Sequence, residues 1–206
     1  DKGLSYLNHE NYKESIACFD KEIKIDPNYD IPWKNKGLAY HYLKNYKKAI
    51  ECYDKATKLN PKDSDTWTEK GLSYHYLKNY KNAIECYDKA IKINPKNEIA
   101  WHNKGLAYYY LENYKKAIVC FNKATDIDAK DGSAWFYKGL ANGKFKNYDQ
   151  AIECYDKVTK LNPKFENIWF GKGWTYSNLG NEKQAIICYK KAIKINPKHS
   201  MAHNNM

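Results

Sequence analysis

Residues 64–97 read SDTWTEKGLSYHYLKNYKNAIECYDKAIKINPKN, a unit of 34 residues that recurs along the chain. The six cysteines stand at positions 18, 52, 86, 120, 154 and 188, which gives five gaps of 34 residues without insertion or deletion. Around each cysteine the same frame of aromatic, small and proline residues returns, as in Trp33, Gly37, Tyr40, Ala49, Tyr53, Ala56 and Pro61. Such a fixed period is typical of repeat proteins, in which each unit packs mainly on its neighbours.

Each unit carries helical spacing twice. A first helix is predicted by residues four, three and three apart, namely Trp33, Gly37, Tyr40 and Leu43. A second helix is predicted by Ala49, Tyr53, Ala56 and Leu59. Asn45-Tyr46 separates the two helices, and Asn60-Pro61 ends the second because proline disfavours helix in the residue before it. The sequence therefore predicts two helices in every unit.

This frame resembles the tetratricopeptide repeat over nearly the whole chain. The resemblance implies an all-α fold, a right-handed α-α superhelical solenoid of helix-turn-helix repeats. We expect a single solenoid over 1–206, made of a partial repeat at 1–29, repeats at 30–63, 64–97, 98–131, 132–165 and 166–199, and the start of a seventh at 200–206. Because both ends fall inside a repeat, we expect the protein itself to be longer.

The chain departs from the family by placing a lysine before each frame glycine, where the family usually has an apolar residue. These lysines are Lys2, Lys36, Lys70, Lys104, Lys138 and Lys172. Their stems should cover apolar surface while the ammonium reaches water, a carbonyl at a helix end or a carboxylate. On this view Lys70→Leu should be tolerated or mildly stabilising. Carboxylates four residues before lysines, such as Asp54 before Lys58, predict exposed pairs along the second helices.

The resemblance also implies that the first helices line a concave groove that binds an extended peptide or a partner helix. The groove positions are Lys34, Leu38, His41, Tyr42, Thr68, Leu72, His75, Tyr76, His102, Leu106, Tyr109, Tyr110, Phe136, Leu140, Phe170 and Trp174. Because most of these side chains are apolar or aromatic, we expect a protein or peptide ligand with apolar or aromatic side chains. Leu72, Tyr76, Leu106 and Tyr110 should form one apolar strip. The alternative is that the leucines only pack neighbouring first helices together.

One binding mode of the family is not expected. The family's basic clamp, which binds a terminal carboxylate, has a lysine followed four residues later by an asparagine. Here Lys34 is followed by Leu38, and leucine stands at the same position in the next two repeats.

The fifth repeat is irregular. Ala129 replaces the proline, Asn142 replaces the frame tyrosine, and Gly143 occupies a groove position. Glycine inside a helix costs about 1 kcal/mol relative to alanine, so this helix should be the weakest. The irregularity is either drift without function or a pocket for a ligand side chain, with Trp174 of the next repeat beside it.

The cysteines predict free thiols. Equivalent positions on packed helices lie about 8–10 Å apart, beyond the roughly 7 Å limit for a disulfide. We expect the cysteines to be small core residues and the protein to act in a reducing, cytoplasmic compartment. We expect neither a leader peptide nor a membrane-spanning segment. His41, His75 and His102 lack further ligands for zinc, and no phosphate loop or nucleophile set stands out. We therefore expect no metal, no cofactor and no enzymatic activity.

Charge predicts at most weak binding to polyanions. The net charge is +11, because 35 lysines, with no arginine, exceed 24 aspartates and glutamates. A nucleic-acid reader would concentrate charge on one face and usually use guanidinium groups, whereas this charge is spread along the chain. Specific nucleic-acid recognition is not expected. Two alternatives to a peptide-binding scaffold stay open: a structural array that self-associates through apolar faces at its truncated ends, and a weak polyanion binder.

Overall fold

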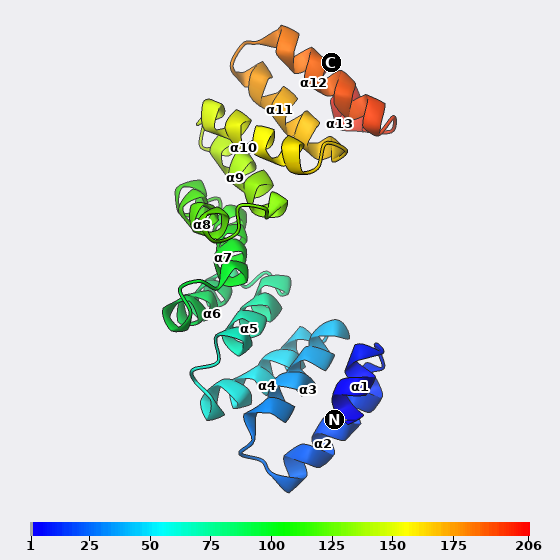
Figure 1. Ribbon diagram of the computed structural model, residues 1–206, viewed down its shortest axis with the longest axis vertical. Coiled ribbons are helices and arrows are strands. Elements are labelled where there is room, and N and C mark those ends of the chain that lie inside the picture. Colours follow the sequence, from blue (N-terminus) through cyan, green and yellow to red (C-terminus); the bar gives the residue numbers. More distant parts are fainter. Residues whose placement is uncertain (1) are drawn as a thin grey trace. The chain divides into compact units, whose positions relative to one another are not determined.

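The computed structural model describes residues 2–206 and is all-helical over that range. Asp1, the first residue of the predicted partial repeat, lies outside the described residues. Within the described range the helices are α1 (Lys2–Asn8), α2 (Tyr12–Ile25), α3 (Asp30–Tyr42), α4 (Tyr46–Leu59), α5 (Ser64–Tyr76), α6 (Tyr80–Ile93), α7 (Glu98–Tyr110), α8 (Tyr114–Ile127), α9 (Gly132–Lys144), α10 (Tyr148–Leu161), α11 (Glu166–Asn178), α12 (Glu182–Ile195) and α13 (Ser200–Asn204) (Figure 1). The predicted all-α class, with two helices in each repeat, is confirmed.

The chain divides into two compact units, Asp1–Ala107 and Tyr108–Met206. In the first unit α1 packs on α2, α3 on α4 and α5 on α6, and the second helix of each of the first two pairs packs on the next pair. In the second unit α9 packs on α10 and α11 on α12, while α8 contacts α9 and α10 contacts α11. The single solenoid over the whole chain stays a prediction.

The turn inside each repeat depends on a residue in the left-handed region. Its φ is positive at Glu10, Lys44, Lys78, Glu112 and Lys146, from 58° to 66°, and the sixth copy is Gly180 at 74°. An asparagine follows each time as the N-cap residue of the second helix, and in four of the six copies its side chain accepts a hydrogen bond from the helix, as Asn45 does from the Lys48 amide at 3.3 Å. The Asn-Tyr dipeptide of the sequence therefore marks the helix start, and the residue before it makes the turn.

Five frame glycines make room for an aromatic ring of the second helix, namely Gly3, Gly37, Gly71, Gly139 and Gly173. A Cβ atom added to Gly71 would lie 2.5 Å from Cε1 of Tyr87, and one added to Gly37 would lie 2.7 Å from Cε1 of Tyr53. The frame alanines are buried, and so are five of the six cysteines, as predicted for small core residues.

The frame tryptophans tie each repeat to the preceding turn. The indole N–H of Trp67 donates to the carbonyl of Pro61 at 3.1 Å, and the same bond recurs in the other repeats. Where Ala129 replaces the proline, Trp135 still donates to its carbonyl at 3.0 Å. The replacement therefore keeps this bond, since the acceptor is a backbone oxygen.

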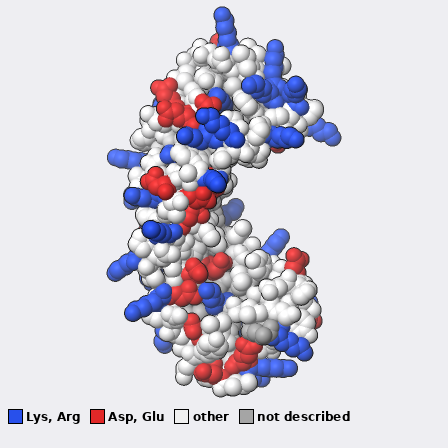
Figure 2. Space-filling model, viewed as in Figure 1, with Lys and Arg blue, Asp and Glu red and all other residues white. Residues whose placement is uncertain are grey.

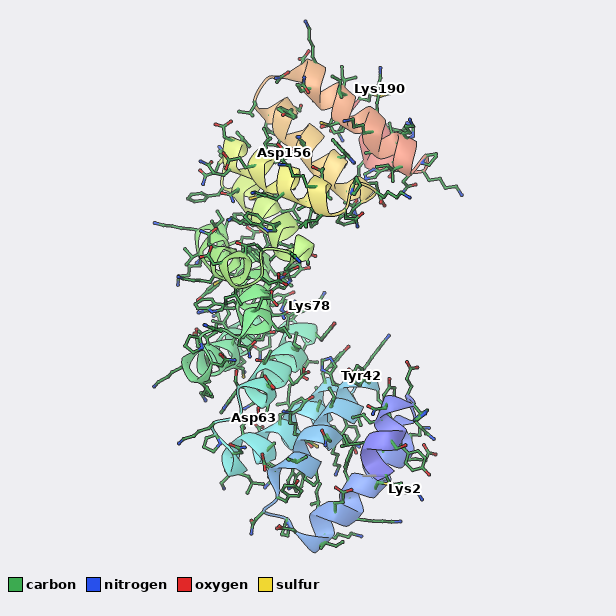
Figure 3. The ribbon with its side chains drawn as sticks, in the orientation of Figure 1. Lys2, Tyr42, Asp63, Lys78, Asp156 and Lys190 are labelled. Atoms are coloured by element: carbon green, nitrogen blue, oxygen red, sulfur yellow. The ribbon has the colours of Figure 1, made fainter. Side chains whose placement is uncertain are left out.

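The lysines before the frame glycines reach carboxylates on the preceding helix. Lys36 pairs with Asp20 at 2.6 Å, Lys70 with Asp54 at 2.5 Å, Lys104 with Asp88, and Lys172 with Asp156 at 2.5 Å (Asp156 is labelled in Figure 3). The lysine side chains are only 12–16% exposed. Carboxylate was one of the three destinations predicted for these ammonium groups. The prediction that Asp54 pairs with Lys58 is wrong. Asp54 pairs instead with Lys70 of the next helix, α5, and not with the exposed Lys58 of its own helix, α4.

Charge is distributed over the surface. Figure 2 shows lysines across the visible face with aspartates and glutamates between them. Among the helices described here, none combines the length and the apolar character needed to cross a membrane.

Candidate functional site

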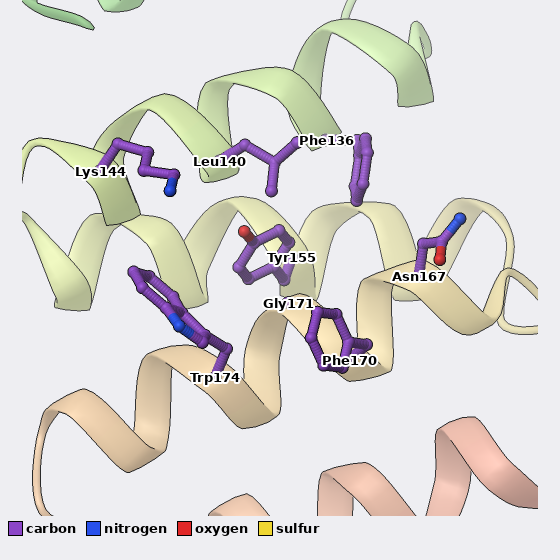
Figure 4. A pocket seen from close by; sticks show the side chains of 8 residues that line it. All are labelled: Phe136, Leu140, Lys144, Tyr155, Asn167, Phe170, Gly171 and Trp174. Carbon is purple, nitrogen blue, oxygen red and sulfur yellow. The ribbon is translucent and has the colours of Figure 1, made fainter. Parts of the chain in front are cut away.

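The second unit contains an apolar pocket between α9, α10 and α11. It has a volume of about 250 Å³ and is lined by Phe136, Leu140, Lys144, Tyr155, Asn167, Phe170, Gly171 and Trp174 (Figure 4). Phe136, Leu140 and Lys144 are four residues apart on α9, so they share one face of that helix. Phe170 and Trp174 are spaced in the same way on α11. The structure thus brings four of the predicted groove residues, Phe136, Leu140, Phe170 and Trp174, around one pocket.

Tyr155 and Gly171 form the floor of this pocket. Tyr155 belongs to the core frame and is 1% exposed. A Cβ atom added to Gly171 would lie 3.0 Å from the Tyr155 hydroxyl, so glycine lets α11 come close to the ring. Sequence reasoning missed both residues. The available signal was Phe-Gly-Lys-Gly at 170–173, where one more glycine precedes the usual Lys-Gly pair.

One end of the pocket is aromatic and positively charged. Gly143 lies against Trp174, since an added Cβ atom would be 3.2 Å from its Cζ3. The ammonium of Lys144 stands 5.8 Å from the centroid of the Trp174 ring. Trp174 therefore fills the space beside Gly143, and the open part of the pocket lies further along, toward Leu140 and Phe136 (Figure 4).

The same residues also contribute to the core. Phe136 and Leu140 pack against a buried cluster made of Ala151, Tyr155, Val158 and Ile168. Both side chains are partly buried, as are Leu38, Leu72 and Leu106 in the first unit. Partial burial is compatible with both alternatives for the leucines. They could contact a ligand in the groove, or they could only pack neighbouring first helices together, and both alternatives stay open.

In the first unit the predicted groove tyrosines form stacked pairs with tyrosines that begin the second helices. Tyr42 stacks on Tyr12 with ring centroids 5.3 Å apart, and Tyr76 stacks on Tyr46 at 5.0 Å with an interplanar angle of 7° (Tyr42 is labelled in Figure 3). Tyr42 and Tyr76 are 53% and 57% exposed, which leaves large aromatic faces open to a ligand. Tyr12 and Tyr46 were missed, although the recurring Asn-Tyr dipeptide marks them.

His41 packs between these aromatic pairs. Its ring lies 5.2 Å from Tyr46 and 5.3 Å from Tyr76, both edge-on. Burial lowers the pKa of His41 below its ordinary value. The Ser73 hydroxyl donates to the Glu69 carbonyl at 3.1 Å, so His41 Nδ1 is the donor in its 2.9 Å bond to Ser73 Oγ. His41 is thus a neutral, partly buried residue.

Polar residues occupy the other predicted groove positions of the first unit. Lys34 pairs with Asp63 at 2.9 Å (Figure 3 labels Asp63). Burial alone would raise the pKa of Asp63, but hydrogen bonds from Lys34 and Thr66 outweigh it and lower that pKa. Thr68 is 4% exposed, accepts a bond from Asn97 Nδ2 at 3.0 Å and donates to the Ser64 carbonyl at 2.9 Å. Thr68 is therefore enclosed by this network.

The remaining predicted groove residues lie on α5 and α7. His75 is partly buried, and burial followed by the nearby His102 lowers its pKa. Tyr109 packs edge-on against Tyr114 and Tyr137 at 5.6 and 6.0 Å, and burial raises its pKa. Tyr110 is 48% exposed. The strip of Leu72, Tyr76, Leu106 and Tyr110 stays a prediction.

The thiols of the core are poor nucleophiles. Burial raises the pKa of Cys52, Cys86 and Cys154 to about 11. Because the thiolate is the reactive form, these side chains are unreactive near neutral pH.

Comparison with known families agrees with this architecture. A tetratricopeptide repeat model matches residues 31–63, 64–97, 99–131 and 132–165, and a second model of the same repeat matches 1–29 and 166–199. The chain belongs to the tetratricopeptide repeat family. A search of curated proteins gave no match.

Solved structures give the same fold. YrrB, described as a TPR protein with an unusual peptide-binding site, is 25% identical, with a TM-score of 0.82 over 90% of this chain and 96% of that chain. MamA is 24% identical, with a TM-score of 0.76 over 80% of this chain and 96% of that chain. A chain of the APC/C hetero-tetramer Cut9-Hcn1 is 20% identical, with a TM-score of 0.74 over 98% of this chain and 40% of that chain.

Proposed function

We propose that this protein is a binding scaffold, acting in a reducing, cytoplasmic compartment, and that the pocket between α9, α10 and α11 receives an apolar or aromatic side chain of a peptide or partner helix. The observation that carries the proposal is that Phe136, Leu140, Phe170 and Trp174, which sequence reasoning assigned to one groove, surround one pocket. The similarity to YrrB, a peptide-binding TPR protein, supports the same function. The region acts by binding and not by catalysis.

The size and charge of the pocket define the ligand further. Pockets for whole small molecules usually occupy about 300–1,000 Å³, whereas this one has about 250 Å³. It therefore suits a single side chain of a longer ligand. Lys144 at the rim favours an acidic residue beside that side chain, because an ammonium group attracts a carboxylate. The exposed rings of Tyr42 and Tyr76 offer a second contact surface on the first unit.

A library of random peptides selected on the purified protein tests this proposal. Enriched peptides should share an apolar or aromatic residue with an acidic neighbour. Truncation of an interface tryptophan costs about 2 kcal/mol or more at the best sites, and about 1.4 kcal/mol is a factor of ten in affinity. Trp174→Ala should therefore weaken an enriched peptide at least tenfold.

The matched control is Ile187→Ala, which removes an apolar side chain that is 46% exposed on α12 and lines none of the described pockets of the second unit. It should bind the peptide as the unchanged protein does. Leu140→Ala serves as a second pocket variant should Trp174→Ala lose helicity. Peptides that bind both pocket variants with unchanged affinity would exclude the pocket. Sedimentation with and without the peptide separates this function from self-association, which would give a concentration-dependent dimer without any peptide.

A further inference from the structure

The row of lysine–aspartate pairs has one gap. Asp20, Asp54, Asp88 and Asp156 each pair with the lysine 16 residues later, but the equivalent residue of the fourth repeat is Asn122. Its lysine is Lys138. Over residues 2–206 no carboxylate lies within ion-pair distance of the Lys138 ammonium, while four of its equivalents each have one.

The position of the Lys138 ammonium reflects this gap. It lies 4.2 Å from the centroid of Trp135. The paired lysines stand farther from their own tryptophans, at 4.8, 5.2, 5.5 and 5.8 Å. In each of those repeats a carboxylate offers the ammonium group a partner away from the ring, and at Trp67 and Trp169 a second lysine, Lys89 or Lys191, lies 4.2 Å from the ring centroid. Without a carboxylate, Lys138 settles on the aromatic face, which is the better of the remaining partners.

A second irregular residue opens a cavity at the same place. Asn142 replaces the frame tyrosine and lines a cavity of about 410 Å³ between α8, α9 and α10, together with Asn122 and Lys138. The equivalent pocket of the second repeat, where Tyr40 is present, measures about 260 Å³. Both departures, the missing carboxylate and the missing phenol ring, therefore fall on one cavity.

The polar part of the cavity lining consists of amide side chains and charged groups with one more lysine than carboxylate. Its amide side chains are Asn122, Asn142, Asn147 and Gln150, and its charged groups are Lys138, Lys157 and Glu153. Asn142 is 2% exposed and held in place: its Nδ2 donates to the Lys138 carbonyl at 2.9 Å, and its Oδ1 accepts from Asn147 at 3.3 Å. The Lys138 ammonium, together with the side-chain amides of Asn122 and Gln150, can donate to a carboxylate.

We propose that this cavity binds a carboxylate from outside the chain, which takes the place of the missing aspartate on Lys138. The carboxylate belongs to a small organic acid or to an acidic side chain of a bound peptide. The site is separate from the pocket described above. Trp135, Lys138 and Asn142 lie three and four residues apart on one face of α9, and Phe136, Leu140 and Lys144 lie on another.

The indole N–H signals of the six tryptophans report on this site by NMR. The Trp135 indole donates to the Ala129 carbonyl at 3.0 Å, so its signal is held in one environment. Glutamate added to the protein should draw Lys138 off the ring and shift the Trp135 signal in a saturable way. The signal of Trp33, whose Lys36 is already paired with Asp20, should stay unchanged. Glutamine and sodium chloride at matched ionic strength are the controls and should leave Trp135 in place.

Asn122→Asp is the decisive variant, because it supplies the carboxylate within the chain. It should remain folded and bind glutamate at least tenfold more weakly. A Trp135 response that chloride reproduces, or that Asn122→Asp retains, would overturn the proposal, as would no response to any acid. A capped peptide containing one glutamate distinguishes the two sources. Binding of free glutamate indicates a site for small acids, and binding of the peptide alone indicates recognition of an acidic side chain.

Discussion

Replacing Lys70 by leucine measures what one of the interhelical ion pairs contributes. The Lys70 ammonium lies 2.5 Å from Asp54 Oδ1, and the two side chains are 12% and 53% exposed. At an effective dielectric constant of about 20 the bare attraction at this distance is roughly 7 kcal/mol. Removing the ammonium from water offsets most of it, and partly exposed pairs contribute a net of about 1 kcal/mol or less.

Lys138 provides a matched control inside the same chain. Lys138→Leu makes the same change beside an equivalent tryptophan, but at a lysine that has no carboxylate partner in the described chain. Both variants lose the packing of the lysine stem and a cation–π contact, which is closer at Lys138 (4.2 Å) than at Lys70 (4.8 Å). We therefore expect Lys70→Leu to lower the free energy of unfolding by about 1 kcal/mol more than Lys138→Leu does. This revises the expectation from the sequence that Lys70→Leu is tolerated or stabilising.

Urea unfolding followed by circular dichroism gives the comparison. The curves should be fitted with a nearest-neighbour model, because repeat arrays need not unfold in two states. The difference between the variants should shrink in about 1 M salt, where the screening length is about 3 Å. Equal losses at both positions would show that the pair contributes nothing. A difference of about 3 kcal/mol or more would match a fully buried pair and contradict the exposure of Asp54.

Four further predictions follow from single residues or from the overall charge. The Tyr87 hydroxyl is buried without a hydrogen-bond partner among the described residues, so Tyr87→Phe should stabilise the protein by about 1 kcal/mol in urea unfolding; Tyr155→Phe, whose hydroxyl does have a partner, should bring no gain. Burial lowers the pKa of His41 in the folded protein. Above about pH 6.5 the His41 ring is therefore neutral in both the folded and the unfolded state. Below that pH the ring is protonated first in the unfolded chain, so the free energy of unfolding falls. His41→Gln should reduce this fall between neutral and acidic pH. Lys78→Gly should stabilise the turn at φ 58° by up to about 1 kcal/mol, and a lower melting temperature would contradict the strain argument. Binding to RNA or duplex DNA should be weak near physiological salt and vanish as salt rises, and sequence-dependent binding that survives salt would refute the scaffold function.

Much of the fold could be predicted from the sequence, because the decisive information is local and repeated. The spacing of Trp33, Gly37 and Tyr40 specifies one face of a helix, and the proline at position 61 specifies where its partner ends. The family resemblance rests on the same positions. For the groove, the sequence could predict which positions line it but not which of those side chains are exposed. Exposure at each position depends on how neighbouring helices pack. Thr68 shows this, because its partner Asn97 lies 29 residues away.

Within each repeat, helix boundaries, turns and core positions were determined by the sequence itself, through the 34-residue period and the helical spacing of apolar residues. Contacts between repeats were decided only by the tertiary structure. Asp54 could pair with Lys58 along its own helix or with Lys70 on the next one, and the distance between packed helices selects Lys70. The pocket on α9 to α11 and the cavity around Lys138 likewise need three helices each. Spacing along one helix orients a side chain, but which groups meet depends on how neighbouring helices cross.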